Sequence, residues 1–126
     1  MKYQHSSRLR PPGLIVALSV GALLGTSVER CDAKVDTGAD LSGIPMDVVT
    51  KLALPAVSSV RVRGVLDATP RAVPVYYVRI SIDNSRWFDL KVFARPRATA
   101  ILGGDLLNQL VLHADGPAGM FELITP

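Results

Sequence analysis

Asp36, Thr37 and Gly38 form a compact group whose residue types suit catalysis. An aspartate can act as a general acid or base, and a glycine lets backbone N–H groups approach its carboxylate without steric hindrance. The triplet follows an extended run, and residues 39–45 lack the alternation expected of the second strand of a hairpin. Because Asp and Gly also favour exposed turns, the triplet alone leaves a turn and a catalytic loop both open.

The chemistry that suits this triplet is peptide hydrolysis by two carboxyl groups. Two neighbouring aspartates share one proton, so one activates a water molecule while the other protonates the substrate carbonyl oxygen. The sequence contains a single Asp-Thr-Gly triplet, at Asp36–Gly38. A symmetric homodimer would supply the second aspartate on its two-fold axis.

Two motifs in order resemble the retropepsin-like (retroviral-type) aspartic proteases, in particular their bacterial-type members. The stretch VDTGAD, residues 35–40, is similar to their active-site loop, and ILGGDLLNQL, residues 101–110, is similar to their second signature. The resemblance implies an all-β fold, a single-lobed acid protease barrel with one or two short helices. It also implies an N-terminal tail at residues 1–11 and a protease domain at residues 12–126.

The resemblance implies a role for each matching residue. Asp36 would be catalytic, while Thr37, Gly38, Ala39 and Asp40 would support the active-site loop and contact substrate backbone; Ile101, Leu102 and Gly103 would form the second signature. The implied protein is an aspartic endopeptidase, active as a homodimer on a peptide or protein substrate, with no cofactor and no metal. The alternative is a catalytically silent retropepsin-like domain that binds peptides or assembles a complex.

The resemblance also makes predictions about the substrate cleft and the dimer. Apolar pockets would be lined by Leu41, Ile44 and Leu102, and the flap that closes over the peptide would fall at residues 64–74. Residues 120–124 would pair across the dimer in a shared sheet. Gly104 departs from the family pattern, which commonly has an arginine there that pairs with the aspartate at the position of Asp40.

The elements that must position these residues are short strands. Apolar runs and two-residue alternation predict strands near residues 14–20, 30–35, 60–63, 76–82, 88–92, 101–103 and 120–124, with short helices within 46–54 and 105–110. Asp105 is expected to cap the second helix. Residues 64–74 and 83–86 read as exposed turns.

Composition narrows the class of protein. The chain has 126 residues, 48% of them hydrophobic and 20% charged, which is typical of one compact domain. Its net charge of +3 comes with scattered arginines, so we expect no nucleic-acid partner. The single cysteine, Cys31, cannot form an internal disulfide, and His5 and His113 have no metal-ligand spacing with it.

The apolar run at residues 13–25 has two interpretations. Basic residues precede it, as in a secretory signal peptide, but it is too short to span a bilayer as a helix. We interpret it as a buried strand, which predicts a cytoplasmic protein without membrane association. A signal peptide stays open as the alternative.

Overall fold

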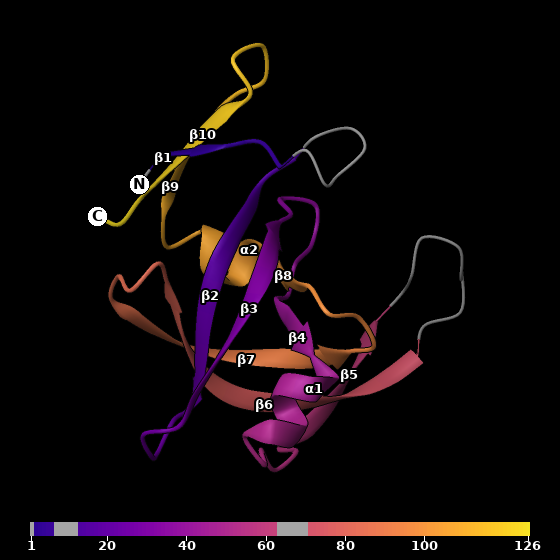
Figure 1. The fold of residues 1–126 in the computed structure, drawn as a ribbon. Helices are drawn as coiled ribbons and strands as arrows, with labels where there is room; N and C mark the ends of the chain where they lie inside the picture. The colour runs from indigo at the N-terminus through magenta and orange to yellow at the C-terminus, as the bar shows by residue number, and fades with distance from the viewer. Residues whose placement is uncertain (1, 7–12, 63–70) are drawn as a thin grey trace.

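The computed structural model describes residues 2–6, 13–62 and 71–126, and these residues are mostly in strands. The elements in chain order are β1 (Lys2–Gln4), β2 (Ile15–Ala22), β3 (Val28–Val35), β4 (Gly43–Pro45), α1 (Met46–Lys51), β5 (Ser58–Val62), β6 (Arg71–Ile82), β7 (Trp87–Arg95), β8 (Ala100–Leu102), α2 (Gly104–Leu107), β9 (Val111–Asp115) and β10 (Met120–Ile124). The predicted all-β class with two short helices is confirmed (Figure 1).

The larger of two sheets in the described chain closes on itself as a barrel. Its strand order is β2-β3-β8-β4-β7-β6-β5, and β2 also pairs with β6, which joins six of the strands in a ring. Most neighbours are antiparallel, but β3–β8 and β4–β7 are parallel pairs. Because parallel strands end at the same edge, the segments that follow β3 and β8 meet there, and so do those that follow β4 and β7.

Alternating residues of the barrel strands build the core. On β7, Phe88, Leu90 and Val92 are buried whereas Asp89 and Lys91 are exposed, as the two-residue pattern of the sequence predicts. Strand β2, which pairs with β3 and with β6, is buried continuously from Leu18 to Gly21, so both its faces are covered there. The apolar run at residues 13–25 therefore contributes a core strand.

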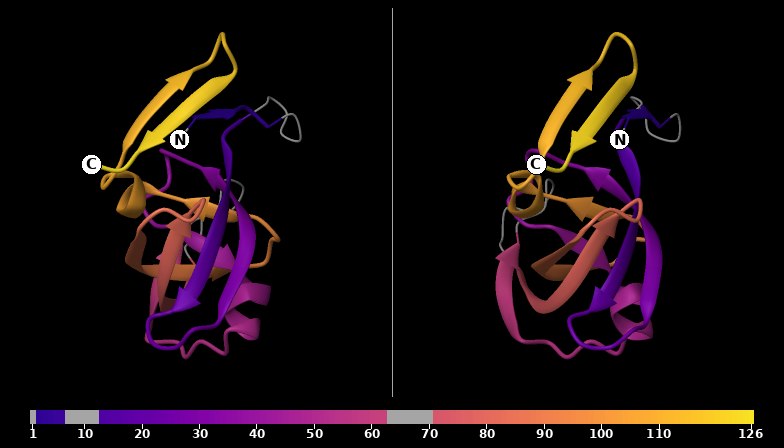
Figure 2. Two further views of the ribbon diagram at one scale, coloured as in Figure 1. Left: turned by 60° about the vertical axis from the view of Figure 1, so that its left-hand side comes forward. Right: turned by 90° about the vertical axis from the view of Figure 1, so that its left-hand side faces the viewer.

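A second sheet of three strands, in the order β1-β10-β9, lies beyond one end of the barrel (Figures 1 and 2). Part of the segment predicted as an N-terminal tail forms β1, which pairs antiparallel with β10. Tyr3 of β1 stacks on Phe121 of β10 with ring centroids 4.8 Å apart, and its hydroxyl donates a hydrogen bond to Asp83. These contacts attach β1 to the barrel and to the closing hairpin.

Three local predictions need correction. Residues 71–74 belong to β6 rather than to a turn, since they pair with β5. The rest of the predicted flap, residues 64–70, lies outside the described residues. Helix α2 is shorter than predicted, and its N-cap is Gly103, not Asp105. Strand β9 was not predicted, because VLHAD lacks a clear apolar alternation.

Candidate active site

Asp36 directly follows β3, where the parallel pairing of β3 with β8 ends. Its backbone N–H donates to the Leu102 carbonyl at 2.9 Å, so the second signature holds the start of the loop. The Gly38 N–H donates to Asp36 Oδ1 at 3.0 Å. This contact matches the expected approach of a backbone N–H to the carboxylate.

The residues after the triplet are fixed by the start of α2. The Gly104 N–H donates to the Ala39 carbonyl at 2.7 Å, and the Asp105 N–H donates to the Asp40 carbonyl at 3.1 Å. Gly103 allows this close approach, because a Cβ there would lie 2.8 Å from the Ala39 oxygen. The two motifs singled out in the sequence are thus joined through backbone hydrogen bonds.

A buried side-chain network that sequence reasoning missed completes the connection. Ser42, fully buried, donates through Oγ to Asp105 Oδ1 at 2.6 Å and through its N–H to Asp105 Oδ2 at 3.0 Å. Ser42 Oγ also accepts the Gly103 N–H at 3.0 Å. The Asp105 carboxylate, predicted as a helix cap, instead ties the active-site loop to α2 and accepts only the adjacent Leu106 N–H within the helix.

Thr37, Asp40 and Gly104 have different environments. Thr37 and Asp40 are exposed, and within residues 2–6, 13–62 and 71–126 no ion pair of the Asp40 carboxylate is found. Gly104 has room for a side chain, since an added Cβ would meet the Ala39 oxygen at 3.6 Å, an ordinary contact distance. The missing arginine is therefore not excluded by crowding at this position.

Two arginines that the sequence analysis did not single out lie shortly before β8, the strand that pairs with β3 and ends next to Asp36. Burial lowers the pKa of Arg95, the charge of Arg97 lowers it further, and the Asp36 carboxylate acts in the opposite direction. Arg95 is the last residue of β7, and Arg97 lies in the segment that connects β7 to β8. The motif Arg-Pro-Arg, shortly before the second signature, is the signal from which they could have been found.

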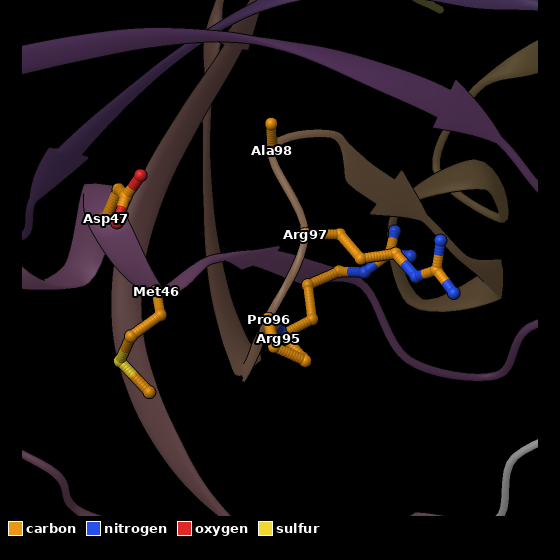
Figure 3. Close-up of a pocket in the computed structure, with 6 residues that line it drawn as sticks. All are labelled: Met46, Asp47, Arg95, Pro96, Arg97 and Ala98. Atoms are coloured by element: carbon orange, nitrogen blue, oxygen red, sulfur yellow. The ribbon is translucent and has the colours of Figure 1, made fainter.

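A surface hollow of about 220 Å³ separates this segment from the start of α1 (Figure 3). It is lined by Met46, Asp47, Arg95, Pro96, Arg97 and Ala98. The predicted apolar pockets are only partly supported, because Ile44 and Leu102 are fully buried in the core and cannot line a cleft. Leu41, with 38% of its surface exposed, stays available.

The part of the chain that the structure describes has neither a cluster of metal-binding side chains nor a helix that could span a membrane. It contains no group of three His, Cys, Asp or Glu side chains arranged to hold a metal ion. None of its helices has the length and hydrophobicity needed to cross a bilayer. Cys31 is a free thiol on β3, and burial, together with Asp32, raises its pKa to about 11.

The solved structures that this fold resembles include retroviral and retropepsin-like proteases. A retropepsin-like aspartic protease from Rickettsia conorii matches with a TM-score of 0.65 at 15% identity, over 99% of this chain and 91% of that one. The EIAV protease in complex with an inhibitor matches with a TM-score of 0.55 at 17% identity, over 76% and 86% of the two chains. The simian foamy virus protease gives 0.55 at 16% identity, over 75% and 92%.

The match to a foamy viral protease–reverse transcriptase bound to an RNA/DNA hybrid covers 12% of that longer chain. No protein-family model and no curated protein matches the sequence. At these identities the structural matches establish the fold, which is retropepsin-like and all-β. The resemblance drawn from the two sequence motifs is confirmed at this level.

Proposed function

We propose that this protein is an aspartic endopeptidase in which Asp36 from each of two identical chains forms one catalytic dyad. The observation that carries the proposal is the environment of Asp36: it follows β3 beside the second signature, with a backbone N–H on its carboxylate. The aspartic proteases that share the fold support peptide-bond hydrolysis as the reaction class.

The chemistry follows from two carboxyl groups that share one proton. The ionised Asp36 takes a proton from a water molecule as the water oxygen attacks the peptide carbonyl carbon, and the protonated Asp36 gives its proton to the carbonyl oxygen. Collapse of the tetrahedral intermediate breaks the C–N bond as the proton taken from water passes to the leaving nitrogen. One hydroxyl of the intermediate returns its proton to the other Asp36, which restores the shared proton of the dyad. The products are a carboxylic acid and an amine.

Replacement of the catalytic carboxyl group tests the proposal. Asp36→Asn should lower kcat/KM on a cleavable peptide by about 10³-fold or more, because an amide neither shares the proton nor activates water. Asp89→Asn, at an exposed aspartate on β7, is the matched control and should keep wild-type activity. Residual activity of Asp36→Asn within tenfold of the wild type would remove Asp36 from the mechanism.

Dilution tests whether the dyad is shared between chains. Specific activity should fall once the concentration drops below the dimer dissociation constant, and sedimentation should show dimers dissociating over the same range. A monomer with full specific activity would contradict the shared dyad. The predicted pairing through β10 needs revision, because β1 and β9 occupy both its edges, so a shared sheet would extend from β1 or β9.

The second candidate is a catalytically silent domain that binds peptides or assembles a complex. The Asp40 carboxylate, without an ion pair among the described residues and next to Gly104, favours it, since the family's usual support for the dimer is missing. A wild-type protein that binds peptides but cleaves none of a diverse library would support this alternative.

A further inference from the structure

The end of β7 and the segment that follows it carry two cations to the edge of the candidate active site. The parallel pairing of β4 with β7 ends at Pro45 and Arg95, and the chain then runs through Pro96 and Arg97 into β8. Strand β8 ends at Leu102, whose carbonyl accepts the Asp36 N–H. The segment enters β8 at Ala100, which pairs with Ala33, and Asp36 follows the last pair, Val35 with Leu102, so one strand of three residues separates the segment from Asp36.

The two guanidinium groups lie on the same side of the segment. Figure 3 shows Arg95 and Arg97 extending together, away from Met46 and Asp47 on the other side of the hollow. Asp47 thus does not neutralise them. The charge of Asp36 acts on Arg95, so the Arg95 guanidinium lies within electrostatic range of that carboxylate, and Arg97 extends beside Arg95.

The side chains of Arg95 and Arg97 lack the stabilising contacts that other arginines of the described chain make. Arg79 stacks on Trp87 and donates to the Gly25 carbonyl, and Arg86 stacks on Phe88. By contrast, no hydrogen bond or ion pair of the Arg95 or Arg97 side chain is found among residues 2–6, 13–62 and 71–126. Two like charges held side by side repel each other, so an anionic group placed between them would be stabilised by both.

We propose that Arg95 and Arg97 form a cationic subsite that selects peptides with a glutamate or aspartate side chain close to the bond that is cut. The inference rests on the proposed peptidase function and adds a substrate class to it. It replaces the expectation of purely apolar pockets, two of whose predicted residues are buried in the core. The planar, doubly donating guanidinium suits a carboxylate, which it can bind through two parallel hydrogen bonds.

The test uses pairs of peptides that differ only by Glu or Gln at one position, scanned over three positions on each side of a cleaved bond. Wild-type protein should prefer Glu at one or two positions by about fivefold or more in kcat/KM, and 0.5 M NaCl should reduce the preference. Both peptides of a pair are measured on the same enzyme sample, so the ratio is insensitive to dimer strength and to the active fraction.

Variants assign the preference to the two arginines. Arg97→Gln and Arg95→Gln should each bring the Glu/Gln ratio to within about twofold of one, and Arg97→Glu should favour Lys over Gln at the same position. Arg95→Lys keeps the charge and should retain part of the preference, which separates charge from loss of packing at this half-buried residue. Arg86→Gln, at the opposite end of β7, is the matched control and should leave the ratio unchanged.

A binding measurement keeps the subsite and the peptidase function distinguishable. Fluorescent Glu and Gln peptides with a reduced scissile bond are titrated with wild type and Arg97→Gln. Cleavage without any Glu preference would overturn the subsite and leave the peptidase function standing. Glu-selective binding that requires Arg97, without cleavage, would support the subsite and contradict the peptidase function. Equal binding of both peptides would overturn the subsite whether or not cleavage occurs.

Discussion

Ser42→Ala should destabilise this protein far more than the loss of one hydroxyl from a surface serine. The hydroxyl of Ser42 is fully buried and makes two hydrogen bonds, one to the Asp105 carboxylate at 2.6 Å and one from the Gly103 N–H at 3.0 Å. The substitution removes both at once. The Ser42 N–H keeps its own bond to the carboxylate, so the effect reports on the hydroxyl alone.

The magnitude follows from the two bonds. A hydrogen bond to a charged group contributes about 1.5–3 kcal/mol, and a buried N–H left without a partner costs about 1–3 kcal/mol. Since neighbouring effects are not fully additive, we expect a loss of about 3 kcal/mol in the free energy of unfolding. For a domain of this size that corresponds to a decrease of about 10 °C in Tm.

Urea unfolding followed by far-UV circular dichroism measures the change, with an unchanged m-value as the sign that the native state is intact. Ser59→Ala, at an exposed serine on β5, is the matched control and should stay within about 0.5 kcal/mol of the wild type. A double-mutant cycle with Asp105→Asn should give a coupling energy above about 1 kcal/mol. If Ser42→Ala costs less than about 1 kcal/mol, the network does not hold the loop.

Two further predictions concern the signature glycines and the buried thiol. Gly103→Ala should lower the free energy of unfolding by about 2 kcal/mol or more in urea, because its Cβ would lie 2.8 Å from backbone atoms of residues 39 and 41. Gly104→Ala should be neutral or stabilising, because the atom nearest to its Cβ would be 3.6 Å away. Since the pKa of Cys31 is raised to about 11, its alkylation by iodoacetamide should keep accelerating up to that pH in the folded chain and level off near pH 9 in urea. A plateau near pH 9 in both states, or equal effects of the two glycine substitutions, would contradict these assignments.

The barrel strands were predictable because one face of each is buried. Strand β7 alternates because only one of its faces is buried. Strand β2 has a continuous apolar run because both of its faces are covered. Strand β9 carries no such signal: its residues are largely exposed, and it is a strand because it pairs with β10. Pairing of this kind depends on distant parts of the chain, so local pattern does not show it.

The candidate site was predictable only where a motif carried it. Asp36 and the second signature were found from residue order, and the structure joins them through the Leu102 carbonyl. The bond between Ser42 and Asp105 spans 63 positions and involves common residue types, so no spacing rule reveals it. Arg95 and Arg97 were treated as part of a scattered charge, because only the pairing of β3 with β8 shows that one short strand separates them from Asp36.

The absence of an arginine at position 104 has different consequences for the loop and for the dimer. Within one chain the active-site loop is already held by the Asp36, Gly104 and Asp105 N–H groups and by the Ser42–Asp105 bond, none of which needs a side chain at position 104. The order of the loop is therefore independent of that arginine. In the proposed dimer, what is missing is the arginine that the resemblance implies as the partner of the exposed Asp40 carboxylate. We therefore expect any weakness that Gly104 introduces to fall on the association of the two chains rather than on the geometry of Asp36.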